Sequence, residues 1–338
     1  VRSSAGSDVC NRQVWYHPCI SDPETHPPLR FDPHNPWFLR QKAILEEGVR
    51  VSQGRFPVTI PDLVENLDIL SALRGPQHLL LDLIERPDFV EERIAEINQV
   101  YFQVFEQLYE IVRDPLGGSV FSAFGIWGPG KTAKVQCDAA AMISPRMFRR
   151  FAVPALAEQC AWLDYSLFHL DGTQAISHLD ALLEIEELDA IEWTPQVSLP
   201  QGGDPMWYDL YQRILKAGKS VQAIDVHPHE VIPLLEAVGP QGMFVRVSAG
   251  SEAEARALVD RFQQELASRL SAAMAEGGPQ RAVDVCRLEA PAIASRLSRE
   301  SAAASAAPRR AGMTSSSSAI TISVGARTWP ARTAAAES

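Results

Sequence analysis

The stretch LFHLDGTQAISHLDALLEIEELDAIEWTPQ, residues 167–196, contains two apolar strand-like runs that both end in ionisable side chains. The first run ends in His169 and Asp171, and the second ends in Glu192 and Trp193. Burying an ionisable group without a partner costs on the order of several kcal/mol, so such groups rarely end buried strands by chance. Their matching positions indicate a repeated architecture with one shared site.

The strand–helix unit of this stretch occurs four times in succession. Strands are predicted at residues 166–171, 188–193, 219–225 and 243–248, followed by helices at 175–187, 205–217, 228–237 and 251–270. Nearly continuous apolar strands alternating with helices predict a parallel sheet covered by helices. With further strand candidates at 56–63, 119–127 and 133–138, the pattern favours a (β/α)8 TIM-type barrel over residues 36–276. An open doubly wound sheet is the alternative.

Two helices precede the repeat. Residues 87–112 show apolar side chains at helical spacing after Pro87, and Pro115 and Gly117 end the pattern. A second helix is predicted after Ser144 as N-cap with Pro145 at its first position, and Pro154 is expected to kink it.

The two ends of the chain differ from this regular middle. Residues 1–35 predict an irregular N-terminal lead-in that packs over the body. Residues 277–338 are rich in Ala, Ser and Arg and carry eight Arg, no Lys and four acidic residues, a net charge of +4. Low apolar periodicity predicts that this segment is a disordered or non-native tail.

The net charge and the cysteine content limit the classes of binding partner and the cellular compartment that we expect. The net charge of the chain is −11, so the part before the tail carries −15, which argues against a nucleic-acid or anionic-membrane surface. No apolar run reaches about 18 residues, the length that a membrane helix needs. The five cysteines are scattered and never form a CxxC pair, which predicts reduced thiols in a cytoplasmic protein.

Polar side chains gather where the predicted strands end. In a barrel these ends converge on one mouth, where active sites are built. We therefore expect one pocket lined by Asp62, Trp127, Asp138, His169, Asp171, Glu192, Asp225, Arg246 and Ser248.

The spacing of these residues suggests their chemistry. His169 and Asp171 are two apart and share one strand face, so the carboxylate can orient the imidazole for acid–base work or metal binding. The alternative is that Asp171 caps the next helix while His169 closes the barrel end. Glu192 beside Trp193 suits a desolvated acid with a raised pKa or a clamp on a cation or aromatic ring; the alternative is a salt bridge at the strand end.

The segment GIWGPGKT, residues 125–132, matches the phosphate-binding pattern G-x-x-x-x-G-K-[ST]. Its context argues against that function. Pro129 removes a backbone N–H from the phosphate cradle, Trp127 adds bulk, and the following residues have strand character.

Three segments resemble the uroporphyrinogen decarboxylase superfamily, which also contains corrinoid-dependent methyltransferases. They are VTIPDLVENLDILSALRGPQHLLLDLIERPDFV (58–90), KVQCDAAAMISPRMFRRFAVPALAEQC (134–160) and FHLDG (168–172), and the resemblance extends over roughly residues 36–270. It implies a (β/α)8 barrel with its pocket at the C-terminal mouth.

The resemblance also implies roles for single residues. Asp62 in IPDL stands where the decarboxylases have their catalytic aspartate, whereas their R-Q-A-G-R motif has only a partial counterpart in WFLRQK, residues 37–42. The methyltransferases hold zinc with His-x-Cys and a distal Cys. Here His169 matches, Asp171 replaces the first Cys, and RVSAG, residues 246–250, offers no second one. Such a His/Asp/Glu set suits a harder metal or direct substrate binding.

These observations predict an enzyme that transfers a methyl group from or to a small molecule, in partnership with a corrinoid protein. The cofactor would be a corrinoid or a divalent metal, the latter at His169 and Asp171. We expect catalytic roles for His169, Asp171, Glu192 and Asp62, and substrate contacts from Trp127, Asp138, Trp193, Asp225 and Arg246. Decarboxylation of a carboxylated tetrapyrrole or smaller acid is one alternative, and a non-catalytic barrel that binds a corrinoid or another ligand is the second.

Overall fold

The computed structural model describes residues 3–4, 15–249, 252–285, 293 and 318–322. The chain has an α/β fold and divides into two compact units, Val1–Asp189 and Ala190–Ser338. Within the described residues, no helix has both the length and the apolar character needed to cross a membrane.

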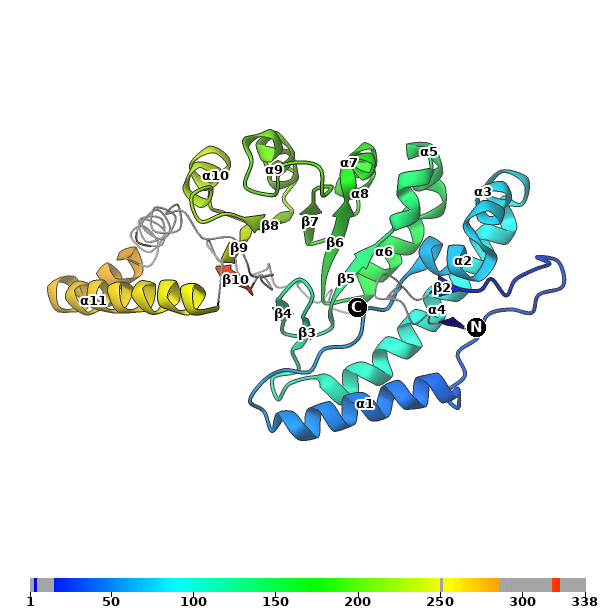
Figure 1. Cartoon of the computed structure of the whole chain (residues 1–338), viewed down its shortest axis with the longest axis horizontal. Coiled ribbons are helices and arrows are strands. Elements are labelled where there is room, and N and C mark those ends of the chain that lie inside the picture. The colour runs from blue at the N-terminus through cyan, green and yellow to red at the C-terminus, as the bar shows by residue number, and fades with distance from the viewer. Residues whose placement is uncertain (1–2, 5–14, 250–251, 286–292, 294–317, 323–338) are drawn as a thin grey trace, which may run out of the picture. The chain divides into compact units, whose positions relative to one another are not determined.

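The first unit is mainly helical around a short parallel strand pair (Figure 1). Its helices are α1 (Pro36–Ser52), α2 (Asn66–Arg74), α3 (Pro76–Glu85), α4 (Pro87–Val112), η1 (Asp138–Met142), α5 (Pro145–Phe151), α6 (Val153–Trp162), α7 (Gly172–Ala175), η2 (Ile176–His178) and α8 (Leu179–Leu183). Its strands are β1 (Ser3–Ser4), β2 (Trp15–Tyr16), β3 (Ser119–Phe121), β4 (Ile126–Gly128), β5 (Thr132–Gln136) and β6 (Tyr165–Asp171).

Strands β5 and β6 are parallel, with Thr132 paired with Tyr165 and Gln136 paired with His169. All five residues of β5 are buried, as a strand covered on both faces requires. The register therefore places the C-terminal ends of the two strands at the same edge, as the sequence predicts.

Two earlier strand predictions are wrong in detail. Residues 57–65 form no strand, because Pro57 and Pro61 lack N–H donors and Thr59 donates to Val120 O through its side-chain hydroxyl at 2.7 Å. Residues 119–127 form the antiparallel hairpin β3–β4 instead of one strand. Gly125, at φ 63°, closes that turn by donating to Ser122 O.

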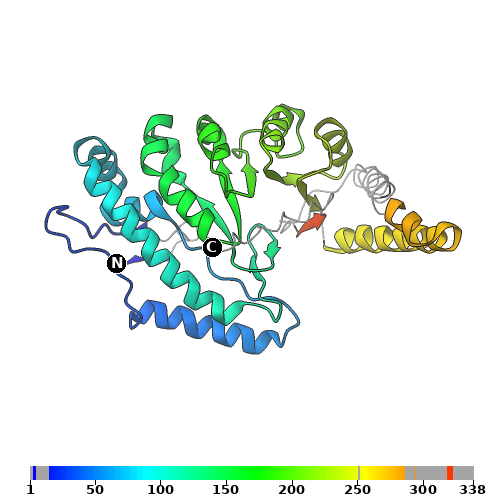
Figure 2. The same ribbon diagram turned by 180° about the vertical axis from the view of Figure 1, so that it is seen from behind.

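The predicted helix starts are confirmed. Helix α4 begins at Pro87, and α5 begins at Pro145 after Ser144, whose hydroxyl accepts from Met147 N at 3.3 Å. Pro154 lies in the first turn of a separate helix, α6, so the expected kink is a break at Ala152. Figures 1 and 2 both show α4 alongside α1, with which it packs.

The buried His178 makes the stability of this unit depend on pH. Its Nε2 lies 2.8 Å from Ala140 O, its ring lies 4.5 Å from Phe148, and burial lowers its pKa. His178 therefore takes up a proton more readily in the unfolded chain than in the folded one. Its contribution to the free energy of unfolding is present above pH about 6.5 and is lost as the pH falls below that value. We expect urea unfolding to show a slope of at most about 1.4 kcal/mol per pH unit from this group.

The matching measurement compares two histidine variants between pH 7 and 5. His178→Gln should flatten that part of the profile, whereas His78→Gln, on the exposed surface of α3, should leave it unchanged. An unchanged profile in His178→Gln would contradict the assignment.

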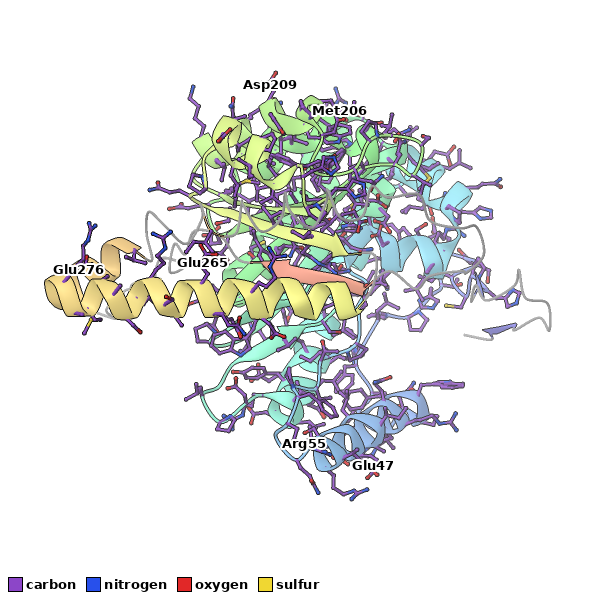
Figure 3. The ribbon with its side chains drawn as sticks, turned by 60° about the vertical axis from the view of Figure 1, so that its left-hand side comes forward. Glu47, Arg55, Met206, Asp209, Glu265 and Glu276 are labelled. Atoms are coloured by element: carbon purple, nitrogen blue, oxygen red, sulfur yellow. The ribbon has the colours of Figure 1, made fainter. Side chains whose placement is uncertain are left out.

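The second unit contains the remaining strand–helix repeats. Its elements are β7 (Ala190–Thr194), η3 (Pro205–Trp207), α9 (Tyr208–Lys216), β8 (Ser220–Val226), α10 (Val231–Val238), β9 (Met243–Ala249), α11 (Glu252–Asp284) and β10 (Ser318–Ile322). Strands β7, β8 and β9 are parallel, and β10 pairs antiparallel with β9. Side chains around the start of α9 alternate between surface and core: Met206 and Asp209 are exposed (Figure 3), whereas Trp207 and Leu210 are buried.

Only parts of the two chain ends lie within the described residues. Residues 17–35 are irregular, as expected, and Ile20 N donates to Leu73 O at 2.9 Å. Of the predicted tail, residues 277–284 continue α11 and residues 318–322 form β10, while most of the rest lies outside the described residues. The eight-stranded barrel closure and the domain boundaries 1–35, 36–276 and 277–338 stay predictions.

Candidate functional site

A buried lysine on β5 organises polar side chains of the first unit. Lys134 is 2% exposed, and its Nζ lies 2.6 Å from Asp62 Oδ1 and 3.7 Å from Glu65 Oε2. The same Nζ donates to Gln136 Oε1 at 2.5 Å. Lys134 and Gln136 are two apart on a strand, so they share one face. Two acceptors, Asp62 and Gln136, therefore lie within hydrogen-bond distance of the ammonium group, and Glu65 Oε2, which has no hydrogen-bond partner of its own, forms a longer ion pair with it.

Glu65 is the most deeply buried acid of this group, with 1% exposure just before α2. Burial raises its pKa well above the ordinary value, and Asp62 and Asp68 push the pKa in the same direction. The charge of Lys134 opposes both effects. The side chain is thus a buried acid whose charge depends on one cation.

Gln136 connects Lys134 to two aspartates. Its Nε2 donates to Asp68 Oδ2 at 3.1 Å and to Asp138 Oδ2 at 3.2 Å. Asp68 also accepts from the backbone N–H groups of Asp138 and Ala139, each at 2.8 Å, and so caps η1 from α2. Because Lys134 binds the amide oxygen of Gln136, the amide nitrogen must face the two carboxyl groups.

Asp138 stands at the solvent-facing end of this chain of contacts. Partial desolvation raises its pKa first, and the nearby Asp68 and Asp171 raise it further, while His169 and Lys134 act against them. Its side chain is nevertheless exposed at the rim. A carboxylic acid that holds its proton to higher pH, yet remains accessible, suits a general acid.

His169 and Asp171 lie at the end of β6, next to the end of β5. His169 pairs with Gln136 in the strand register, and its Nε2 is 4.0 Å from Asp171 Oδ2. The ring of Phe124 lies 5.0 Å from the imidazole, centroid to centroid. We call the whole group the strand-end cluster: Asp62, Glu65, Asp68, Lys134, Gln136, Asp138, His169 and Asp171.

Four of the nine predicted site residues belong to this cluster, namely Asp62, Asp138, His169 and Asp171. Trp127 lies elsewhere in the unit, half-exposed on β4, with its Nε1 donating to Asp114 Oδ2 at 2.9 Å. It lines a cleft of about 820 Å³ whose walls include no member of the strand-end cluster. Its role in substrate binding stays a prediction.

The other four predicted residues belong to the second unit. Glu192 is fully buried on β7 and accepts from Thr194 Oγ1 at 2.7 Å, and Trp193 packs edge-on against Trp207 at 4.9 Å. Asp225 has a positive φ of 51° at a register shift of β8, a position where strands often re-aim a side chain. Arg246 is half-buried on β9. The roles of all four, and the grouping of Glu192 with His169 and Asp171, stay predictions.

Four members of the cluster are absent from the sequence-based prediction: Glu65, Asp68, Lys134 and Gln136. A signal was present, because polar side chains at 134, 136 and 138 alternate with apolar ones in KVQCD. Such alternation inside an otherwise buried strand marks one polar face. The acids Asp62, Glu65 and Asp68 recur every third residue before and into the start of α2.

The expected metal site has little support in the described part of the chain. There, no group of three or more His, Cys, Asp and Glu side chains is placed to hold a metal ion. We therefore assign no chemical step to a metal.

The phosphate-loop pattern GIWGPGKT lies in a context that does not suit phosphate. Its residues run from β4 into β5, so a strand follows instead of a helix, as expected. Lys131 Nζ binds Glu106 at 2.8 Å and lies 4.1 Å from the Trp162 ring centroid. A phosphate would have to displace both partners.

We therefore expect no magnesium-dependent ATP binding that depends on Lys131. Calorimetric titration of the full chain with Mg-ATP should give the same absence of heat for the natural protein and for Lys131→Ala. Tight binding that disappears in Lys131→Ala would contradict the strand assignment as well as this prediction.

Comparisons with known proteins give one structural likeness. No protein-family model matches the chain, and no curated protein sequence matches it. Among solved structures, a methyltransferase from Methanosarcina mazei is similar at 10% sequence identity, with a TM-score of 0.48. The likeness covers 70% of this chain and 65% of that one, so this chain spans just under two thirds of that structure's length.

Proposed function

We propose that the chain is an enzyme that removes a methyl group from a small-molecule donor, with Asp138 as the general acid and a corrinoid, held by a partner protein, as the methyl acceptor. The observation that supports it is the accessible Asp138 carboxyl group, whose pKa is raised beside His169 and Asp171. The resemblance of residues 58–90, 134–160 and 168–172 to the uroporphyrinogen decarboxylase superfamily, which contains corrinoid-dependent methyltransferases as well as decarboxylases, supports this reaction class.

A methyl group bound to oxygen or nitrogen needs such an acid to leave. When the carbon–heteroatom bond breaks, the electron pair stays on the heteroatom, which then takes a proton. Asp138 would supply that proton and become a carboxylate. His169, oriented by Asp171, would return a proton to Asp138 from solvent after each turnover.

The exposed rim of the strand-end cluster carries hydrogen-bond acceptors, which complement the hydrogen-bond donors of a corrinoid. A bound reduced corrinoid would supply the nucleophile for the methyl group. The peripheral amides of its ring are hydrogen-bond donors, and the exposed carboxylates of Asp62, Asp138 and Asp171 are acceptors. These side chains are the ones on the described rim that would contact it.

The charge of the cluster argues against decarboxylation of a tetrapyrrole that carries many carboxylates. Five acidic side chains, Asp62, Glu65, Asp68, Asp138 and Asp171, surround one buried cation, Lys134, whose partners are already in place. Like charges at short range repel, so a polyanion would be held poorly. A neutral methyl donor suits the cluster better, because its departing oxygen or nitrogen takes up the proton that Asp138 supplies.

The test uses the full chain with reduced cobalamin under anaerobic conditions. Methyl ethers, methylamines and methyl thioethers are offered in turn, and methylcobalamin is followed by its absorbance spectrum. We expect turnover with an ether or amine donor, and Asp209→Asn on the exposed surface of α9 should keep it. If a folded chain methylates cobalamin from no donor class, the proposal is wrong, and ligand binding without turnover would favour the non-catalytic alternative.

A further inference from the structure

A second, mainly apolar pocket adjoins the strand-end cluster at Asp62 and lies in the first unit between α2, α4 and the segments at residues 29–30 and 62–64. Its volume is about 450 Å³, within the range of small-molecule sites. Two helices supply most of its wall, through Ile69, Ala72, Leu73, Ile97, Val100 and Val104. The body of a bound molecule would therefore lie against aliphatic side chains.

Tyr101 places one hydroxyl group on this wall. The side chain is 4% exposed on α4, with its ring packed at 5.8 Å from Phe105. Its hydroxyl is not among the fully buried polar atoms that lack a hydrogen-bond partner in the described part of the chain, and Tyr101 also lines a small neighbouring cavity with Glu65 and Lys134. Burial raises its pKa well above the ordinary value, so the group keeps its proton and can donate it in a hydrogen bond.

Two charged side chains also line the pocket, and only one of them lacks a counter-ion. Asp62 is bound by Lys134 at 2.6 Å, so its charge is largely offset. Arg30 is exposed at the edge and has no ion-pair partner within the described ranges. The nearby Glu96 does not compensate it, because that carboxylate binds Leu29 N at 2.8 Å and Arg93 at 3.0 Å.

We propose that this pocket binds a small amphipathic carboxylate, whose hydrocarbon body lies between α2 and α4 and whose carboxylate binds Arg30. An apolar wall favours the hydrocarbon body, because its burial removes apolar surface from water. The unpaired guanidinium selects the sign of the charged end, since it offers paired N–H donors to a carboxylate. The site does not depend on catalysis at Asp138.

Three eight-carbon probes test the proposal by isothermal titration of the full chain, below the concentration at which they form micelles. Octanoate should bind saturably at one site, 1-octanol should bind more weakly, and octylammonium more weakly still. This order follows from Arg30, because the hydrocarbon body is the same in all three. Equal affinity for octanoate and octylammonium, or heat that never saturates, would overturn the proposal.

Variants separate the charge from the cavity. Arg30→Gln should weaken octanoate binding at least tenfold and leave 1-octanol unchanged, whereas Arg40→Gln, beside the exposed Trp37 on α1, should change neither. Ala72→Phe fills the cavity and should abolish binding of both probes. Because Arg30 is exposed, its variant will fold even if Ala72→Phe does not, and unchanged octanoate affinity in Arg30→Gln would sink the idea.

Discussion

Replacing Lys134 with methionine is expected to lower the free energy of unfolding by about 3–5 kcal/mol, the usual cost of removing one partner from a buried ion pair. The ammonium group is the only cation that contacts both Asp62 and Glu65 within the described residues, and it also fixes the amide oxygen of Gln136. Methionine has a similar volume, so the loss reports charge and hydrogen bonding more than packing. Urea unfolding at pH 7 measures it.

Lys131 offers a matched control on the same part of the chain. Its side chain is ten times more exposed than that of Lys134 and its partner Glu106 is half-exposed, so Lys131→Met should cost at most about 1 kcal/mol. If the two lysine variants lose equal stability, the buried contacts of Lys134 with Asp62, Glu65 and Gln136 do not stabilise the fold more than an exposed ion pair does.

A second variant identifies the acid that Lys134 keeps in place. Glu65 has a raised pKa, so its protonated form suits the fold and is favoured as the pH falls. The loss in Lys134→Met should therefore shrink toward acid pH, where the buried carboxylate takes up a proton. Glu65→Gln removes the charge permanently, so the double variant should recover part of the lost stability at neutral pH.

The strands that the sequence predicts well are those with unbroken apolar runs. β6 to β9 each contain a short apolar run, and most of their residues, like all of those in β5, are buried or half-buried, as in a sheet covered on both faces. The failures have local causes. Pro57 and Pro61 prevent a strand at 56–63, and Gly125 turns the chain back within 119–127.

The candidate site was predictable only at its rim. Asp138, His169 and Asp171 end strands, and strand ends can be recognised without knowing the rest of the fold. Lys134 and Glu65 are buried, and the sequence does not reveal which distant side chains neutralise them. The sequence therefore does not show that Lys134 binds Asp62, or that it binds the amide oxygen of Gln136 while the amide nitrogen donates to Asp138.

The largest expected effect on activity is that of Asp138→Asn. If the Asp138 carboxyl group donates the proton to the departing oxygen or nitrogen, an amide cannot replace it, and kcat should fall about 10²- to 10⁴-fold. Asparagine keeps the size of the side chain and can still accept from Gln136 Nε2, so the fold and substrate affinity should change little. Rates of methylcobalamin formation and the melting temperature measure the two effects.

The pH profile of turnover distinguishes this role from a structural one. Activity requires protonated Asp138, so it should fall as the pH rises through the raised pKa of that group. Asp171 contributes to raising this pKa, and Asp171→Asn removes that negative charge, so the pKa drops and activity should disappear at lower pH than in the natural protein. Asp209→Asn, the same substitution at an exposed position on α9, should leave the pH at which activity falls unchanged. Two results would contradict the proposal: an unchanged pH of the activity loss in Asp171→Asn, or an unchanged rate in Asp138→Asn. Either result would assign the proton transfer to a group other than Asp138.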